Sequence, residues 1–230
     1  MANAPASAPV DTKTALDWSH KEEFRKQFAR QAIKSYIFLS FGMGFIALLL
    51  PIVLPVIGGY DGHYSISFFY YVSDLTRNIL VGALWATGVF LFLFHGLSKV
   101  ENWILNVAGV AVISVAMNPM PPDQGNKELT VHAASAVIFF LCLAIVAVKY
   151  SKGRLEKIIY PPIKRRFEMA YNGAGAAMLA MPAAVIALHF LGPKTEFSHW
   201  VYWVEAFGIW SFSFYWFVKT QEYRLLLGLR

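Results

Sequence analysis

The polar side chains that could do chemistry in this sequence are few, and long apolar runs separate them. A serine beside a histidine can act as a nucleophile in acyl transfer, because the histidine accepts the hydroxyl proton. A carboxylate within an apolar run is costly unless it is paired or protonated, so we expect it to face a partner inside the protein. We take as candidates for one shared catalytic site Ser67, Asp74, Arg77, His132, His189 and Glu205.

Glu205 is the only carboxylate that the sequence places inside a predicted membrane span, about one helical turn below its outer end. We expect its partner to be Arg77, which lies at the same predicted depth, or else His132 or His189. A functional Glu205 would handle a proton or bind a ligand. A structural Glu205 would form a buried ion pair that fixes the register of two helices.

Four serines are candidates for the nucleophile. None of them lies in a Gly-x-Ser-x-Gly elbow, the turn that exposes the nucleophile of many hydrolases. Serines in such positions also cap helices or form hydrogen bonds between helices. The sequence leaves both roles open for Ser65, Ser67, Ser73 and Ser135.

Histidines and aspartates gather on the outer side of the predicted spans, where side chains from different helices could hold a metal. No His-x-x-His or His-x-x-x-His spacing occurs, so no local pair of histidines defines a ligand set. Paired axial histidines for haem, such as His132 with His189, are a second alternative without an attachment motif. We therefore predict no cofactor and no metal. The side chains concerned are His63, His132, His189, His199, Asp61, Asp74 and Asp123.

The composition is typical of a membrane protein. Of the 230 residues, 57% are hydrophobic and 15% are charged, whereas soluble domains have about 45–50% and about 25%. Six segments are apolar and close to the roughly 20 residues that a helix needs to cross a bilayer. Barrel strands would alternate over about 10 residues, and these segments do not. The sequence thus predicts an all-α polytopic bundle with spans at residues 35–58, 78–96, 103–120, 131–148, 170–191 and 201–218.

The basic residues indicate the orientation of these spans. All but three of the 20 Lys and Arg residues fall on the side of the two termini, and the exceptions are Arg77, Lys127 and Lys194. By the positive-inside rule, both termini are cytoplasmic and the segment from Asp61 to Arg77 faces outward. The basic residues that give the net charge of +6 then lie mainly at the cytoplasmic surface of the membrane, so we do not expect nucleic acid as a partner.

The chain divides into four parts around these spans. Residues 1–14 are rich in Ala and Pro, and we expect a disordered tail there. Residues 15–34 mix basic and aromatic residues, which predicts an amphipathic interfacial helix that binds anionic lipid at the cytoplasmic face. A charged helix that simply extends the first span is the alternative. Residues 35–219 form the membrane domain, and residues 220–230 form a cytoplasmic tail.

Several short motifs are similar to those of known membrane proteins. They are Ser65-Ile-Ser67, Arg77-Asn-Ile-Leu-Val-Gly82, Glu101-Asn102 with Ala108-Gly109, His132 with Phe139-Phe140, and Trp203 with Glu205 and Trp210. Through them the chain resembles uncharacterised bacterial six-span membrane proteins of the DUF998 type, related to the Frag1/DRAM membrane families. The Ser, Asp and His inventory is more faintly similar to that of the CREST membrane hydrolases, seven-span enzymes with a catalytic zinc. The resemblance implies a six-span protein of a bacterial cytoplasmic (inner) membrane.

Three functions are compatible with the sequence. The first is a non-catalytic accessory or assembly subunit that binds lipid or the helices of other membrane subunits, which the aromatic sixth span and the small residues of the fifth favour. The second is an enzyme, a hydrolase or acyl transferase that modifies a lipid at the outer leaflet through the six candidate residues. The third is a proton-coupled transporter that works through Glu205, which the apolar middle of every span disfavours.

Overall fold

Helices make up the architecture of the part of the chain that the structure describes. The computed structural model describes residues 12–60, 65–96, 98–120, 130–158, 160–191 and 200–228, and no strand occurs within these ranges. Its long helices are α1 (Thr12–Gly58), α3 (Asp74–Leu93), α4 (Lys99–Met117), α5 (Val131–Ile145), α6 (Pro161–Leu191) and α7 (Trp200–Leu226). The shorter elements are α2 (Phe69–Val72), a π-helical turn (Val146–Tyr150) and a 3-10 helix (Ser151–Lys157). The predicted all-α fold is confirmed.

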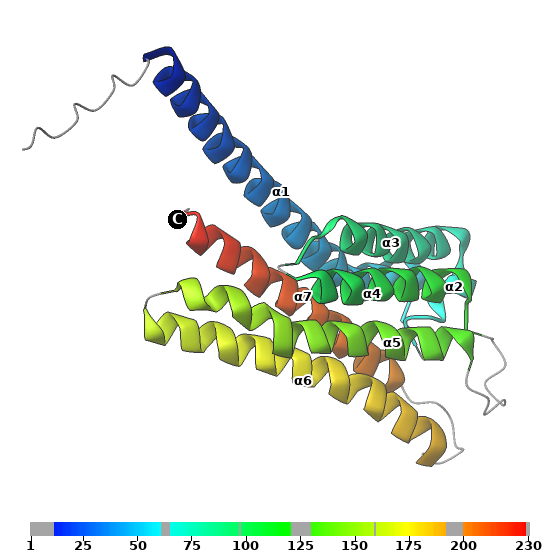
Figure 1. The fold of residues 1–230 in the computed structure, drawn as a ribbon. Helices are drawn as coiled ribbons and strands as arrows, with labels where there is room; N and C mark the ends of the chain where they lie inside the picture. The colour runs from blue at the N-terminus through cyan, green and yellow to red at the C-terminus, as the bar shows by residue number, and fades with distance from the viewer. Residues whose placement is uncertain are drawn as a thin grey trace, which may run out of the picture.

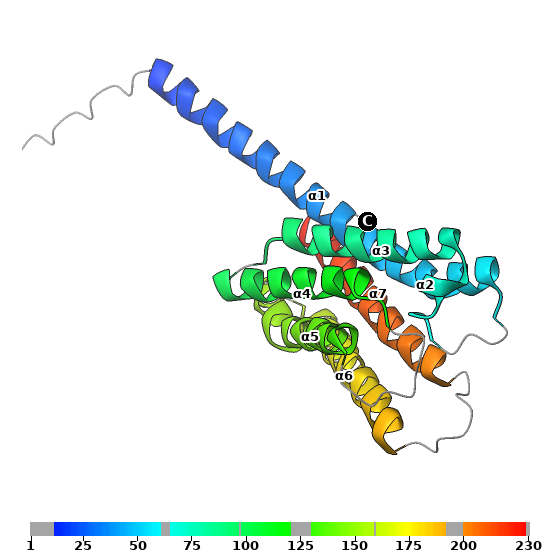
Figure 2. The same cartoon turned by 90° about the vertical axis from the view of Figure 1, so that its right-hand side faces the viewer.

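The long helices pack in a closed ring. Helix α3 packs on α4, α4 on α5, α5 on α6, α6 on α7, α7 on α1, and α1 on α3. In Figure 1, α3, α4 and α5 run nearly side by side, and the first half of α1 projects away from the bundle. Figure 2 shows the same projection of α1 from the side. Because the ring is closed, all these helices can contribute side chains to one interior space.

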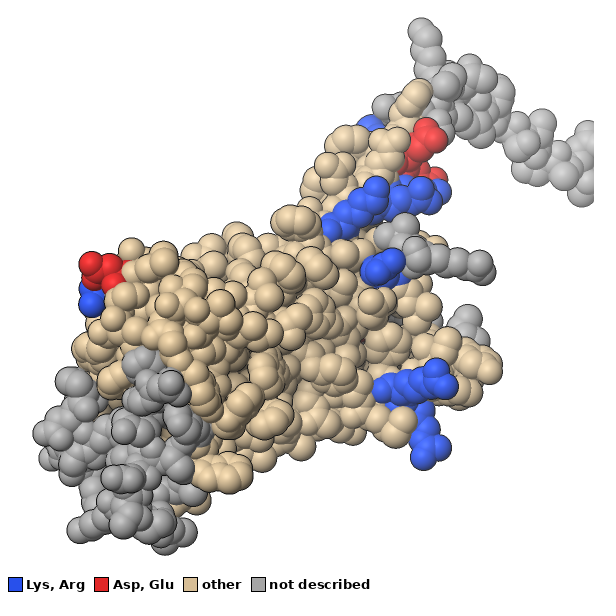
Figure 3. Space-filling view, turned by 180° about the vertical axis from the view of Figure 1, so that it is seen from behind, with Lys and Arg blue, Asp and Glu red and all other residues tan. Residues whose placement is uncertain are grey.

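Four of the described helices are long and apolar enough to cross a membrane. They are His20–Gly58, Asp74–Leu93, Lys99–Met117 and Val131–Gly153. Large apolar side chains on them are exposed, including Phe38 at 76% and Trp103 at 72%. On the face drawn in Figure 3, the charged side chains lie at the two ends of the molecule, with an uncharged surface between them. Such a surface suits contact with acyl chains, so the protein is an integral membrane protein.

Helix α1 joins segments that the sequence suggested were separate. It runs from Thr12 to Gly58 as one helix of 47 residues. It therefore contains the end of the predicted tail (1–14), the predicted interfacial helix (15–34) and the first predicted span (35–58). The helix is continuous, as in the alternative of a simple extension, and its contact with a membrane surface stays a prediction.

Glycines permit the closest contacts between helices. A Cβ on Gly88 of α3 would lie 2.5 Å from the Cγ1 of Ile113 and 3.0 Å from the carbonyl oxygen of Gly109, both on α4. A Cβ on Gly175 of α6 would lie 2.5 Å from the Cγ2 of Val148. These two contacts set how closely α3 approaches α4 and how closely α6 approaches the π-helical turn after α5.

Two buried clusters hold the ring together. The larger one includes Phe94 and Trp216, whose ring centroids are 4.8 Å apart. The smaller one includes Leu54 of α1, Phe69 of α2 and Tyr202 of α7. The smaller cluster fixes the short α2 helix and the turn before it against α1 and α7, and this turn carries the first residue of the candidate site.

Candidate functional site

Ser67 and His132 meet in the folded chain although 65 residues separate them. Ser67 lies in the turn before α2, and His132 lies in the first turn of α5. The Oγ of Ser67 is 2.9 Å from the Nε2 of His132, and the Nδ1 of His132 is 2.9 Å from the carbonyl oxygen of Asn118. A carbonyl oxygen can only accept a hydrogen bond, so Nδ1 carries the ring proton and Nε2 accepts from the Ser67 hydroxyl. The pair has the arrangement of a nucleophile and its general base, with a third group that orients the base.

Two helix ends place His132 and the carbonyl group that orients its ring. The last carbonyl groups of a helix have no partner within the helix, and Asn118 is the C-cap residue of α4. Its carbonyl is therefore available to the ring of His132. Thr130 caps the start of α5 by accepting from the amide of Ala133, which fixes the turn that carries His132.

Glu205 holds the turn that carries Ser67. Its Oε2 accepts a hydrogen bond of 2.6 Å from the amide of Ile66. Glu205 lies in the second turn of α7, so the contact joins the end of the chain to the segment before α2. The carboxylate thus holds the main chain at the residue directly before Ser67.

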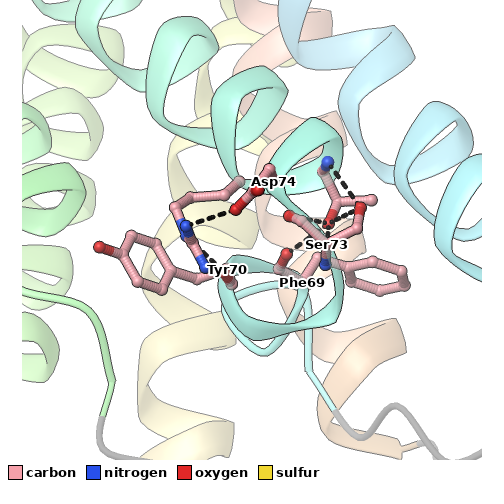
Figure 4. Close-up of polar contacts among 6 residues, drawn as sticks. Phe69, Tyr70, Ser73 and Asp74 are labelled. Atoms are coloured by element: carbon pink, nitrogen blue, oxygen red, sulfur yellow. Dashed lines mark hydrogen bonds and ion pairs between the residues drawn. The ribbon is translucent and has the colours of Figure 1, made fainter.

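The predicted ion pair between Glu205 and Arg77 is wrong. The Nη1 of Arg77 is 2.8 Å from the Oδ1 of Asp74, and its Nε donates to the carbonyl of Tyr70 at 3.0 Å. Figure 4 shows Asp74 close to Tyr70 and to Ser73, the residue that caps α3. The side chain of Asp74 is 88% exposed. Asp74 is only three residues from Arg77 on the same helix, so the local pair forms at the surface. Asp74 and Arg77 therefore do not belong to the site around Ser67.

An apolar cavity of about 190 Å³ opens beside the Ser67–His132 pair. Ser67, His132 and Glu205 all line it, so the structure brings three of the six predicted site residues together. The rest of the lining is mainly aliphatic and aromatic. It comes from all the long helices, and includes Leu50, Leu80, Val112, Phe140, Met181 and Ile209.

The other candidate serines have structural contacts. The Oγ of Ser65 accepts from the amide of Phe68, and Ser73 caps α3 in a reciprocal pair with Thr76. The Oγ of Ser135 is 2.9 Å from the Oγ of Ser114, a hydrogen bond between α5 and α4. Both roles that the sequence left open therefore occur, and Ser67 is the candidate serine that contacts a described histidine.

Several predicted ligands lie outside the part of the chain that the structure describes. The backbone of His189 belongs to α6, but its side chain is outside the described residues, as are Asp61, His63, Asp123 and His199 in full. Among the side chains that are described, no group of three or more His, Cys, Asp and Glu residues is placed to hold a metal ion.

The sequence reasoning missed a buried polar cluster at the other end of the bundle. Lys219 and Glu222 are fully buried on α7, with 3.5 Å between Nζ and Oε2. Tyr171 of α6 donates to Glu222, and Ser151 accepts from Lys219 at 3.2 Å. Glu205 is therefore not the only acid within the bundle, since Glu222 is also buried. The signal was the spacing of Lys219 and Glu222, which share one face of a helix that continues beyond the predicted span.

Comparison of the chain with protein-family models, with curated proteins and with solved structures gives no match.

Proposed function

We propose that this protein is a serine-dependent lipid hydrolase or acyl transferase, with Ser67 as the nucleophile and His132 as the general base. The hydrogen bond from Ser67 to His132 at the edge of an apolar cavity is the observation that carries the proposal. An apolar cavity with a few convergent polar groups is the usual form of a site for a largely apolar ligand. A role as a helix cap would not require the hydroxyl of Ser67 to donate to a histidine. The role of nucleophile requires a histidine whose accepting nitrogen is turned toward the serine, as the Nε2 of His132 is.

In the proposed reaction, the Oγ of Ser67 attacks the carbonyl carbon of an ester, and its proton moves to the Nε2 of His132. The bond from this carbon to the alcohol oxygen breaks, and His132 returns the proton to the leaving alkoxide. The product is an ester of the acyl group with Ser67. A water molecule, or a second alcohol in a transfer reaction, then attacks the acyl carbon while its proton moves to the Nε2 of His132. The bond from the acyl carbon to the Oγ of Ser67 breaks, and His132 gives the proton to this Oγ.

Two further groups would position the pair. The carbonyl of Asn118 holds His132 in the tautomer that accepts from Ser67. The carboxylate of Glu205 holds the Ile66 amide and so fixes the backbone next to Ser67. In this proposal Glu205 is a positioning residue and does not touch the substrate carbonyl.

We further propose that the chain crosses a bacterial cytoplasmic (inner) membrane six times, with both termini in the cytoplasm. Helices α6 and α7 have 31 and 27 residues, more than the roughly 20 that a span requires. Both belong to the same ring as the four apolar helices. The ends that meet at Ser67 would then lie on the extracytoplasmic side, within reach of outer-leaflet lipid.

The first half of α1 would lie near anionic lipid at the cytoplasmic face. Phe24 and Phe28 are 68% and 67% exposed there, and their ring centroids are 6.4 Å apart. Basic residues such as Lys26 lie on the same stretch, which is the composition of an interfacial helix. The resemblance to DUF998-type proteins stays a prediction, as does the alternative of an accessory subunit.

The proposed activity can be tested with purified protein in detergent, a fluorescent fluorophosphonate and p-nitrophenyl octanoate. We expect the wild type to be labelled and to hydrolyse the ester, and Ser67→Ala to do neither. His132→Gln is expected to react more slowly by about 10²–10⁴-fold, because it lacks the general base. Ser211→Ala is the matched control, since its hydroxyl bonds to the Phe207 carbonyl of its own helix.

Thermal unfolding of each variant separates loss of chemistry from loss of fold. Labelling or hydrolysis that persists in Ser67→Ala at the wild-type rate would contradict the proposal. A folded wild type that neither labels nor hydrolyses esters of any chain length would also contradict it, and would favour the accessory-subunit hypothesis.

A further inference from the structure

The lining of the cavity beside Ser67 extends along several turns of α5 and is polar at one end. Its lining on α5 reaches from His132 to Phe140, a distance of about 12 Å at 1.5 Å per residue. The polar side chains in the lining, Ser67, Tyr70, His132 and Glu205, belong to the end where α2 lies and where α5 and α7 begin. Away from that end the lining is apolar.

We propose that this cavity binds one acyl chain of the substrate, with the ester carbonyl at Ser67 and the chain directed toward Phe140. This inference rests on the proposed function and names its substrate class as acyl esters of lipids. A sugar or a charged head group in the apolar part would leave polar groups without partners, which is costly. An alkyl chain has no such groups, and its transfer from water to this lining is favourable.

Gly208 is the residue that sets the length of the accepted chain. It lines the cavity on α7, about one helical turn further along the helix than Glu205. A Cβ at this position would lie 3.3 Å from the Cβ of Met181 and 3.3 Å from the Cζ of Phe140. Met181 and Phe140 also line the cavity, and at 3.3 Å both would have to shift to admit a side chain at 208. A larger side chain at 208 would therefore displace these two lining residues and narrow the cavity beside them.

Variants at two lining positions test the acyl-chain site, because they should change the length of the cavity in opposite directions. We expect Gly208→Val to shorten the cavity and Phe140→Ala to lengthen it. The first readout is the ratio of Ser67-dependent hydrolysis of p-nitrophenyl palmitate to that of p-nitrophenyl butyrate. The second is displacement of bound cis-parinaric acid by palmitate and by octanoate, which needs no catalysis.

Gly208→Val should lower the palmitate to butyrate ratio by about tenfold or more, the scale on which apolar pockets discriminate methylene groups. Phe140→Ala should raise the ratio. Gly173→Val is the matched control, because a Cβ at the exposed Gly173 meets nothing within 4 Å. If Gly208→Val does not fold, Gly208→Ala and Phe140→Ala still test the proposal.

The outcomes separate this inference from the proposed function. An unchanged ratio in folded variants that keep Ser67-dependent hydrolysis would overturn the acyl-chain assignment and leave the proposed function standing. If the wild type shows no Ser67-dependent hydrolysis, the displacement assay still tests whether the cavity binds an acyl chain. Weaker displacement by palmitate in Gly208→Val would support the chain site, and unaltered displacement in both variants would overturn it.

Discussion

At the scale of single residues, the site depends on hydrogen bonds to the backbone. His132 is oriented by the carbonyl of Asn118, and Glu205 binds the amide of Ile66. Backbone groups are present at every position and carry no sequence signal. Sequence reasoning could therefore select Ser67, His132 and Glu205 as polar residues near one boundary, but it assigned Glu205 to Arg77. A pair of opposite charges can be recognised in a sequence. Which backbone amide is free to donate a hydrogen bond can be seen only in the folded structure.

Replacement of Glu205 tests its positioning role. Glu205→Ala would leave the amide of Ile66 without its acceptor, and an unsatisfied buried donor costs about 1–3 kcal/mol. We expect a lower unfolding temperature and slower fluorophosphonate labelling of Ser67. Glu205→Gln keeps one acceptor oxygen and should lose less of both.

The control for Glu205→Ala is a carboxylate that makes no contact with the backbone near Ser67. Glu22 on α1 is 70% exposed and pairs with Lys26, so Glu22→Ala should leave stability and labelling unchanged. Equal behaviour of Glu205→Ala and wild type in both measurements would show that the contact with Ile66 does not position Ser67.

At the scale of elements, the sequence indicated where several helices lie but not which helices pack against each other. The apolar runs predicted α3, α4 and α5 within a few residues, because lipid-facing and core-facing positions must both be apolar. The starts of helices depend on caps, and α3 begins at Asp74 because Ser73 caps it. The close contact of α3 with α4 depends on Gly88, which hydropathy does not distinguish from any other glycine.

Two glycines on α3 provide a matched test of that contact. In Gly88→Ala the new Cβ would lie 2.5 Å from Ile113, and such overpacking costs about 1–3 kcal/mol. In Gly82→Ala the new Cβ meets nothing within 4 Å, and alanine is favoured over glycine in a helix by about 1 kcal/mol. Thermal unfolding in one detergent should therefore rank Gly82→Ala above wild type and wild type above Gly88→Ala. Equal unfolding temperatures for the two variants would contradict the close approach of α3 and α4.

At the scale of the whole molecule, the proposed orientation can be tested by labelling. Cys142 is the only cysteine in the chain, so Cys142→Ser gives a background without thiols. Asp74→Cys and Lys26→Cys then place single thiols at sites that are 88% and 69% exposed. A membrane-impermeant maleimide should label Asp74→Cys in intact spheroplasts and Lys26→Cys only after lysis. The reverse pattern would show that the termini face outward and that the site opens to the cytoplasm.

A helical membrane protein could be predicted from the sequence, because the length and hydropathy of a segment depend only on its own residues. An apolar run long enough to cross a bilayer is recognisable whatever it packs against in the fold. Which polar side chains share a site depends instead on how the helices pack. Ser67 meets His132 because the closed ring brings the end of α4, the start of α5 and the turn before α2 together. For the same reason Lys219 and Glu222 are buried although they follow the last predicted span, since α6 and the segment after α5 cover that face of α7.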